Sequence, residues 1–212
     1  MTDLFIYGAG GLGREIASLV KEGAIDGLKW NLAGFIDDAK EPGAEVSGLK
    51  VVGGETVLSS ITRPAAVVFG FADPHAKERL YLRLSKNPNI EFPTLIHPLA
   101  RVDASATLAD GVVITQFCSV AVDAVLGRCA FMNVGSMVGH DTVIGDFCTL
   151  MPHADVVGGI TVGPRSLVGL GAKVLQGLSI GADSVVGIGS VVISRVPDGV
   201  TVMGNPARVV RK

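Results

Sequence analysis

The sequence predicts a two-part chain, in which an α/β domain with a small parallel sheet precedes a parallel β-solenoid. Three observations support this prediction. An apolar strand, a glycine-rich turn and a helix follow one another at the N-terminus, and an aliphatic or Met side chain recurs at every sixth position from Ile96 to Val192. The 212 residues also include 28 glycines but only 8 Phe, 2 Tyr and 1 Trp. This balance indicates a narrow core filled by aliphatic side chains.

The composition excludes several classes of protein. Apolar residues make up 48% of the chain and charged residues 18%, which excludes intrinsic disorder. The longest stretches without Asp, Glu, Lys or Arg have 12 residues, as at 111–122, whereas a membrane-spanning helix needs about 20 apolar residues. A net charge of −2 provides no positive field for nucleic acid or anionic lipid. We therefore expect neither nucleic acid nor a membrane as a partner.

The N-terminus and the cysteines indicate the compartment. Residues 1–7 are acidic and contain too short an apolar run for a secretory signal, so we expect a cytoplasmic protein. Cys118, Cys129 and Cys148 form no CxxC pair, and an odd number of cysteines argues against a disulfide framework. We expect free thiols and no metal site, because the Cys and His residues lack the spacing of metal ligands.

Residues 1–92 are expected to form the α/β domain. A strand at 4–7 leads into a turn with the pattern GxGxxG, after which apolar residues follow at helical spacing. Such a turn lets backbone N–H groups and a helix N-terminus approach a phosphate. A strand at 32–36 ends in two aspartates that are candidate partners of a ribose or base, and a strand at 66–71 precedes a helix at 75–85. The candidate binding residues are Gly8, Gly10, Gly11, Leu12, Gly13, Asp37 and Asp38.

The glycine turn leaves alternatives open. A dinucleotide such as NAD is one ligand that this pattern takes, but about ninety residues are few for a full dinucleotide fold. The segment also has no Lys/Tyr or Cys/His set for hydride chemistry. A mononucleotide fits better, and a glycine-tight turn without any ligand remains the structural alternative.

Residues 93–212 are expected to form the solenoid. Neither a helix nor simple alternation gives a period of six, so each hexad is expected to be one short strand and a corner. Three hexads close a coil, and residues 18 apart stack about 4.8 Å from one another. The sixteen hexads from His97 to Val192 give a little over five coils. The recurring positions are Ile96, Val102, Leu108, Ile114, Val120, Leu126, Met132, Val138, Ile144, Leu150, Val156, Val162, Val168, Val174, Ile180, Val186 and Val192.

This period resembles that of the hexapeptide-repeat acyltransferases, and the whole chain resembles the bacterial nucleotide-sugar acetyltransferases among them. These include bacillosamine-pathway and perosamine N-acetyltransferases and sialic-acid O-acetyltransferases. The resemblance implies a Rossmann-like domain followed by a left-handed β-helix, a nucleotide-linked sugar on the N-terminal half, a homotrimer, and acetyl-CoA in the groove between neighbouring helices. It rests on residues 7–13, 35–38, 96–98, 138–141 and 204–208.

Acyl transfer needs a base for the nucleophile's proton and a donor for the developing oxyanion. His140 is expected at a corner of the coil and is our candidate base, at the position of the family's catalytic histidine. The resemblance makes Asp141 its partner, although adjacent side chains of a regular strand point to opposite faces. Gly158 lies one coil above His140, since 140 + 18 = 158, and its N–H suits an oxyanion. Gly159 leaves the backbone open to the pantetheine arm.

Further candidate acetyl-CoA contacts are Gly169, Leu170, Gly187, Ile188 and Arg208. The resemblance assigns the C-terminal stretch that contains Arg208 to the CoA end of the groove, and the alternative is a turn that caps the solenoid. His75 and His97 are expected to be structural, and His153 a solvated corner residue. The related bacillosamine-pathway enzymes carry histidines where this chain has Leu12 and Thr149, and these departures concern the identity of the sugar.

The resulting hypothesis is acetyl-CoA-dependent N-acetylation of a nucleotide-linked amino sugar. O-acetylation of a sugar hydroxyl, as in the sialic-acid branch, is the first alternative, and an NAD-binding or purely structural protein is the second. The sequence leaves open the nucleotide, the sugar and the acyl group.

Overall fold

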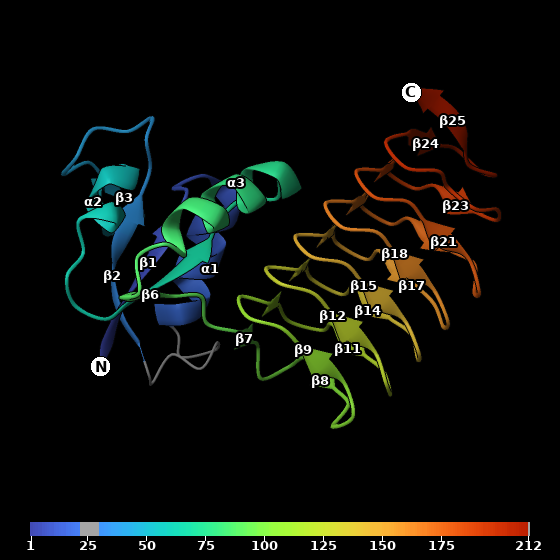
Figure 1. Cartoon of the computed structure of the whole chain (residues 1–212), viewed down its shortest axis with the longest axis horizontal. Helices are drawn as coiled ribbons and strands as arrows, with labels where there is room; N and C mark the ends of the chain where they lie inside the picture. The colour runs from blue at the N-terminus through green and yellow to red at the C-terminus, as the bar shows by residue number, and fades with distance from the viewer. Residues whose placement is uncertain (22–29, 212) are drawn as a thin grey trace. The chain divides into compact units, whose positions relative to one another are not determined.

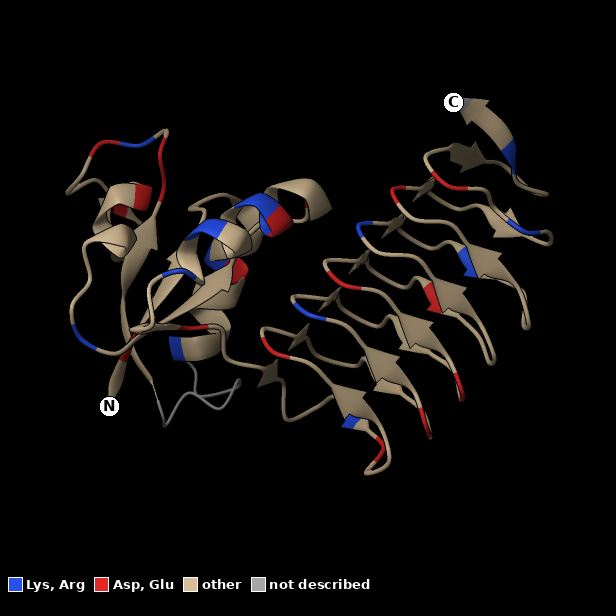
Figure 2. Cartoon of the chain, in the orientation of Figure 1, with Lys and Arg blue, Asp and Glu red and all other residues tan. Residues whose placement is uncertain are grey.

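The protein is described by a computed structural model that covers residues 1–21 and 30–211 and divides into two compact units, Met1–Leu95 and Ile96–Lys212 (Figure 1). The predicted fold class, an α/β domain followed by a parallel β-helix, is confirmed. None of the described helices is long and apolar enough to cross a membrane. Figure 2 shows Lys and Arg interspersed with Asp and Glu along the chain.

The N-terminal unit is built on a six-stranded sheet with the order β3-β4-β2-β1-β5-β6. All neighbours run parallel except β3 and β4, which pair antiparallel. This hairpin was not predicted, because β3 has only two residues and therefore no periodicity to read. The strands are β1 (Thr2–Tyr7), β2 (Trp30–Ile36), β3 (Glu45–Val46), β4 (Leu49–Gly53), β5 (Ala65–Phe69) and β6 (Ile90–Glu91).

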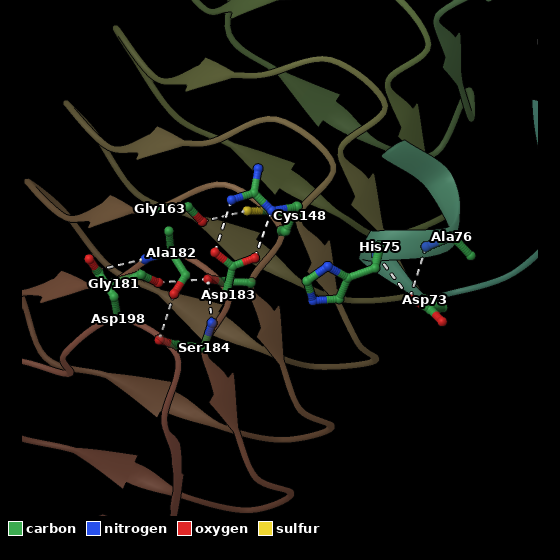
Figure 3. Close-up of polar contacts among 12 residues, drawn as sticks. Asp73, His75, Ala76, Cys148, Gly163, Gly181, Ala182, Asp183, Ser184 and Asp198 are labelled. Atoms are coloured by element: carbon green, nitrogen blue, oxygen red, sulfur yellow. Dashed lines mark hydrogen bonds and ion pairs between the residues drawn. The ribbon is translucent and has the colours of Figure 1, made fainter. Parts of the chain in front are cut away.

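In the described part of this unit three helices accompany the sheet: α1 (Gly11–Lys21), α2 (Glu55–Ser59) and α3 (Pro74–Leu84). The apolar stripe of α1 is buried at Ile16, Ala17 and Val20, as its helical spacing predicts. Asp73 caps helix α3: its carboxylate accepts hydrogen bonds from the N–H groups of His75 and Ala76, as Figure 3 shows. Pro74 at the first helical position has no N–H to leave unpaired.

The C-terminal unit is a β-helix with three walls of short strands, which have two residues each from β7 to β23. Wall 1 contains β7 (Leu95–Ile96), β10 (Val113–Ile114), β13 (Phe131–Met132), β16 (Thr149–Leu150), β19 (Leu167–Val168), β22 (Val185–Val186), β24 (Thr201–Met203) and β25 (Arg208–Arg211). Wall 2 contains β8 (Arg101–Val102), β11 (Ser119–Val120), β14 (Met137–Val138), β17 (Asp155–Val156), β20 (Lys173–Val174) and β23 (Val191–Val192). Wall 3 contains β9 (Thr107–Leu108), β12 (Val125–Leu126), β15 (Val143–Ile144), β18 (Thr161–Val162) and β21 (Ser179–Ile180).

The register of the walls follows the predicted stacking of residues 18 apart. Val120 pairs with Val138, and Val138 pairs with Val156. From β10 to β23 the second residue of each strand faces the interior, and all the predicted aliphatic positions from Ile114 to Val192 are buried. The period of six therefore fills the core of the β-helix, and it fixes which residues meet at each corner.

Each coil turns at three corners, which we call the 1–2, 2–3 and 3–1 corners after the walls they join. One residue of almost every turn has a positive φ and lies in the left-handed region. Glycine occupies it in several coils, but so do the non-glycine residues Phe117, Asp123, Cys129, Asp141, Phe147, His153, Arg165 and Asp183.

Candidate active site

His140 and Asp141 form the 2–3 corner between β14 and β15. The Nδ1 atom of His140 lies 2.7 Å from Oδ2 of Asp141, and both side chains are about two-thirds exposed, at 64% and 66%. Asp141 has φ 55°, so the chain does not follow the alternation of a regular strand here, and the two side chains meet. The sequence alone left open whether these two adjacent side chains could meet.

The carboxylate selects the tautomer of the imidazole. An ionised carboxylate only accepts hydrogen bonds, so Nδ1 of His140 carries the proton that it donates to Asp141. In the neutral ring Nε2 then has a free lone pair. Asp141 thus orients the ring and presents Nε2 as a proton acceptor.

Gly158 stacks on this corner from the next coil. A Cβ atom at Gly158 would lie 2.4 Å from Nε2, 2.5 Å from Cε1 and 2.8 Å from Cδ2 of His140, so the face of the ring beside Nε2 rests over the glycine backbone and the lone pair in the ring plane stays free. The N–H of Gly159 donates to the carbonyl oxygen of His140 at 2.8 Å. The structure therefore brings His140, Asp141, Gly158 and Gly159 together at one corner.

The other predicted acetyl-CoA contacts lie elsewhere on the β-helix. Gly169 and Leu170 follow β19, and Gly187 and Ile188 follow β22, so all four lie at the 1–2 corner. Leu170 and Ile188 are exposed there. A Cβ atom at Gly169 would lie 2.6 Å from the carbonyl oxygen of Val186, and one at Gly187 would meet Met203. The backbone of the next coil thus requires glycine at 169, whereas the Met203 side chain can move aside at 187. Within one chain none of the four residues reaches the corner of His140.

His153 also lies at the 1–2 corner, where its ring packs against Gly135. A Cβ atom at Gly135 would lie 2.5 Å from Nδ1 of His153. The arrangement resembles that of His140 and Gly158, but the residue that follows His153 is Ala154 rather than an acid. His153 therefore lacks the adjacent carboxylate that fixes the tautomer of His140.

Arg208 begins β25, which pairs antiparallel with β24 after the turn at 204–207. Its guanidinium Nη1 donates to the carbonyl oxygen of Ala207 at 2.9 Å. The hairpin adds to the last coil through β24, which pairs with β22. Lys212, which the sequence groups with this basic end of the chain, lies outside the described residues.

The glycine turn of the N-terminal unit connects β1 to α1. Gly8 has φ 102°, which favours glycine. A Cβ atom at Gly13 would lie 1.9 Å from the carbonyl oxygen of Gly8, so only glycine lets the helix approach the strand. Gly10 and Gly11 are exposed, with no atom near the place of a Cβ, and Leu12 is half-buried. The exposed pair leaves the N-terminus of α1 open to a ligand.

Asp37 and Asp38 hold this turn through contacts within the protein. Asp37 accepts hydrogen bonds from the N–H groups of Ala9 and Ala39 at 2.9 and 3.0 Å. Asp38 accepts one from the Tyr7 hydroxyl and one from the N–H of Glu55 at 2.8 Å. The sequence predicted that these carboxylates bind a ligand and did not reveal that they form hydrogen bonds within the protein. Each oxygen keeps a second lone pair for a ligand.

Arg14 is a candidate that the sequence reasoning missed. A surface hollow beside the first turns of α1 is lined by Gly11, Arg14, Glu15, Ser18 and Ser47. The guanidinium of Arg14 donates to the carbonyl oxygen of Gly10 at 3.4 Å. A cation next to an open helix N-terminus complements a phosphate group. The sequence signal that could have identified Arg14 was a cation four residues after Gly10, within the first turns of the predicted helix.

The glycine turn predicts different outcomes for two alanine substitutions. Gly13→Ala should destabilise the N-terminal unit strongly, because its Cβ would overlap backbone that cannot move aside. Gly11→Ala should leave the melting temperature nearly unchanged, since nothing occupies the space of its Cβ. Thermal unfolding followed by circular dichroism compares them. Equal melting temperatures for the two variants would contradict the tight packing of Gly13.

Tyr7 predicts a change in alkaline stability. Burial, reinforced by the neighbouring Asp38 carboxylate, raises the pKa of Tyr7 above its ordinary value of 10.0. The stability from this difference is complete below pH 10.0 and falls as the pH rises toward the folded-state pKa. When the pH is raised from neutral to above 10, the free energy of unfolding of Tyr7→Phe should therefore fall less than that of the parent. Urea unfolding measures this, and parallel pH dependences would contradict it.

The described residues contain no group of three His, Cys, Asp or Glu side chains arranged to hold a metal ion. Cys118, Cys129 and Cys148 are buried and form no disulfide within the part of the chain that the structure describes.

The chain matches a known protein family and a curated relative in sequence. Residues 3–84 match the family described as the PglD N-terminal domain. The chain is 30% identical over 214 residues to a GDP-perosamine N-acetyltransferase of Escherichia coli O157:H7, covering 98% of this chain and 96% of the relative.

Two solved structures are similar over nearly their whole length. PerB from Caulobacter crescentus, solved in complex with CoA and GDP-perosamine, has a TM-score of 0.84 and 30% identity, with 99% of this chain and 97% of PerB covered. The acetyltransferase domain of PglB from Neisseria gonorrhoeae has a TM-score of 0.89 and 27% identity, with coverage of 99% and 100%.

Proposed function

Since this chain belongs to the hexapeptide-repeat family of bacterial nucleotide-sugar acetyltransferases, we propose that it transfers the acetyl group of acetyl-CoA to the amine of a nucleotide-linked amino sugar. The relative of 30% identity is an N-acetyltransferase for GDP-perosamine, and the similar PerB structure holds CoA and GDP-perosamine. These relatives support an acyltransferase that uses acetyl-CoA as its donor.

In this proposal His140 is the general base. Its Nε2 accepts a proton from the amine as the nitrogen attacks the thioester carbon. The C–N bond forms, the C–S bond breaks, and the imidazolium returns the proton to the thiolate of CoA. Asp141, 2.7 Å from Nδ1, stabilises the imidazolium by its negative charge. General-base assistance of this kind contributes about 10²–10⁴-fold to a rate.

The N–H of Gly158 is the proposed oxyanion donor. Gly158 lies against His140, and its N–H donates to no acceptor among the residues that the structure describes. A donor that is free in the resting enzyme and fixed beside the base is available to the oxygen of the tetrahedral intermediate. Gly159 provides open backbone for the pantetheine arm.

The N-terminal unit is proposed to bind the nucleotide. The exposed Gly10 and Gly11 at the start of α1 suit a phosphate, and Arg14 adds a positive charge. Gly8, Leu12 and Gly13 shape this turn. Asp37 and Asp38 hold it and keep lone pairs for a ribose or base.

We further propose that the active protein is a homotrimer with each site between two chains. Leu170 and Ile188 lie at the 1–2 corner, whereas His140 lies at the 2–3 corner. If Gly169, Leu170, Gly187, Ile188 and Arg208 contact the same acetyl-CoA that His140 serves, they must come from a neighbouring chain.

One observation supports this function more than any other: Nε2 of His140 rests against Gly158 while its Nδ1 is held by Asp141. Release of CoA thiol, measured across UDP-, dTDP- and GDP-linked amino sugars with free sialic acid and the matching hydroxyl sugars, tests it. We expect turnover only where the acceptor carries an amine. Turnover of sialic acid alone would favour O-acetylation, and titration that detects NAD but no acetyl-CoA binding would overturn the proposal.

A further inference from the structure

One residue of each coil along the 2–3 corner packs against the interior, and together these buried or partly buried residues form a ladder that is mostly apolar. In successive coils this ladder consists of Ala106, Ala124, Thr142, Ile160 and Leu178. Thr142 is the one residue of this ladder with a hydroxyl group, and it belongs to the coil that carries His140. It has no exposed surface. A hydroxyl buried in an apolar interior is costly unless it is hydrogen-bonded, so its partners indicate what it does.

The Thr142 hydroxyl bonds to both sides of the Gly158–Gly159 turn. Its Oγ1 donates to the carbonyl oxygen of Val157 at 3.0 Å and accepts from the N–H of Ile160 at 3.3 Å. The same hydroxyl also lies 3.4 Å from the carbonyl oxygen of His140. Thr142 therefore ties the turn of the base to the turn of the glycines in the next coil.

The bond to Val157 also fixes the direction of the Gly158 N–H. The carbonyl of Val157 and the N–H of Gly158 belong to one peptide group, and the cis peptide recorded in the described chain is at a different place, Asn205–Pro206. In a trans peptide the C=O and N–H bonds point in opposite directions. Because the buried Thr142 hydroxyl holds the carbonyl inward, the N–H of Gly158 points out of the β-helix, at the corner where Nε2 of His140 lies.

We infer that Thr142 is a positioning residue for acetyl transfer, which holds the Val157–Gly158 peptide group so that its N–H meets the developing oxyanion. A hydrogen bond to the carbonyl also polarises the peptide group and strengthens its N–H as a donor. This inference rests on the proposed function and names the group that prepares the oxyanion donor.

The other corners provide a matched control. Ser166 is equally buried, its Oγ donates to the carbonyl oxygen of Gly181 at 2.7 Å, and it accepts from the N–H of Ser184 at 3.1 Å. These are the same offsets of 15 and 18 residues that Thr142 uses, but at the 3–1 corner. Cys148 makes the equivalent bond to Gly163 at 3.1 Å (Figure 3). Figure 3 also shows the N–H of Ala182, in the peptide group that Ser166 holds, bonded to Asp198.

The experiment compares Thr142→Val, Thr142→Ser and Ser166→Ala by steady-state thiol release with the best acceptor sugar. Loss of an oxyanion donor costs about 10²–10³-fold in kcat, so misdirecting it should lower the kcat of Thr142→Val by about tenfold or more. The KM for acetyl-CoA should stay within about twofold. Thr142→Ser should restore kcat, and Ser166→Ala should lower the melting temperature without lowering kcat.

The pH profile separates this role from an effect on the base. Because Thr142→Val leaves the contact between His140 and Asp141 intact, the plateau of kcat/KM should fall while the midpoint of the profile stays in place. A shifted midpoint, failure of Thr142→Ser to restore kcat, or an equal loss in Ser166→Ala would overturn the inference. If Thr142→Val does not fold, Thr142→Ala replaces it, because alanine occupies this hexad position at Ala124 and Ala154 and has no group to hold the Val157 carbonyl, and an unchanged kcat there would overturn the inference too.

The result is distinct from a failure of the proposed function. If His140→Ala retains full turnover, the assignment of the base fails whatever Thr142 does. If His140→Ala is inactive and Thr142→Val is fully active, only the role of Thr142 fails.

Discussion

Replacing His140 with alanine should lower kcat for acetyl transfer by about 10²–10⁴-fold, the contribution of a general base. The fold should survive, because the His140 side chain is 64% exposed and an exposed ring contributes little to the core. Thiol release with the best acceptor sugar measures the loss, and thermal unfolding measures the stability.

His75→Ala is the control for the loss of an imidazole. His75 is exposed at the start of α3 in the N-terminal unit and has no place in the proposed chemistry. It should keep kcat within about twofold of the parent, as expected for a surface substitution away from the reacting groups. Near-normal turnover in His140→Ala would remove His140 from the role of base.

Gly158→Ala should have the second large effect. Its Cβ would lie 2.4 Å from Nε2 of His140, and the ring is the part that can move aside. The imidazole should therefore swing out of position with little loss of melting temperature. Since a misplacement of about 1 Å can cost about 10²-fold, we expect a fall in kcat of that order.

The double variant isolates the contact between these two residues. Once His140 is alanine, a Cβ at position 158 has no ring to displace, and the backbone N–H is still present. Gly158→Ala should then cause little further loss in kcat, so the two effects should be far from additive. If the kcat losses of His140→Ala and Gly158→Ala multiply in the double variant, the alanine at position 158 acts on acetyl-CoA rather than on His140.

Much of the β-helix was predictable because its period fixes its register. The aliphatic side chain in every hexad must face the interior, so counting by 18 places Gly158 over His140 without any coordinates. The same arithmetic places Leu170 and His140 at different corners, since they are 30 residues apart and 30 is not a multiple of 18. Cys118 and Cys148, also 30 residues apart, lie on different walls for the same reason. The assignment of acetyl-CoA contacts from the sequence did not apply this count.

The corner geometry was not predictable from residue types. Asp141 meets His140 because it lies in the left-handed region, a conformation that usually favours glycine. The equivalent hexad position holds Phe117 at the 1–2 corner and Cys129 and Arg165 at the 3–1 corner, so side-chain chemistry does not mark it. The stacking of the coils imposes the conformation, and only the folded chain reveals which neighbouring side chains meet.

The aspartates after β2 illustrate a second limit. A carboxylate at the end of a strand beside a glycine turn is typical of ribose recognition, and this led to the assignment of Asp37 and Asp38 to a ligand. In the structure they bind Ala9, Ala39, Tyr7 and Glu55. Three of these partners are backbone N–H groups, which every sequence supplies and no pattern distinguishes.

A structure of the His140→Ala variant with acetyl-CoA and the best acceptor sugar tests the central claim most directly. The account predicts the thioester oxygen within hydrogen-bonding distance of the Gly158 nitrogen, about 2.7–3.1 Å. It also predicts the acceptor amine in the space that the imidazole has left. A thioester bound at another corner, or an amine directed away from position 140, would contradict it.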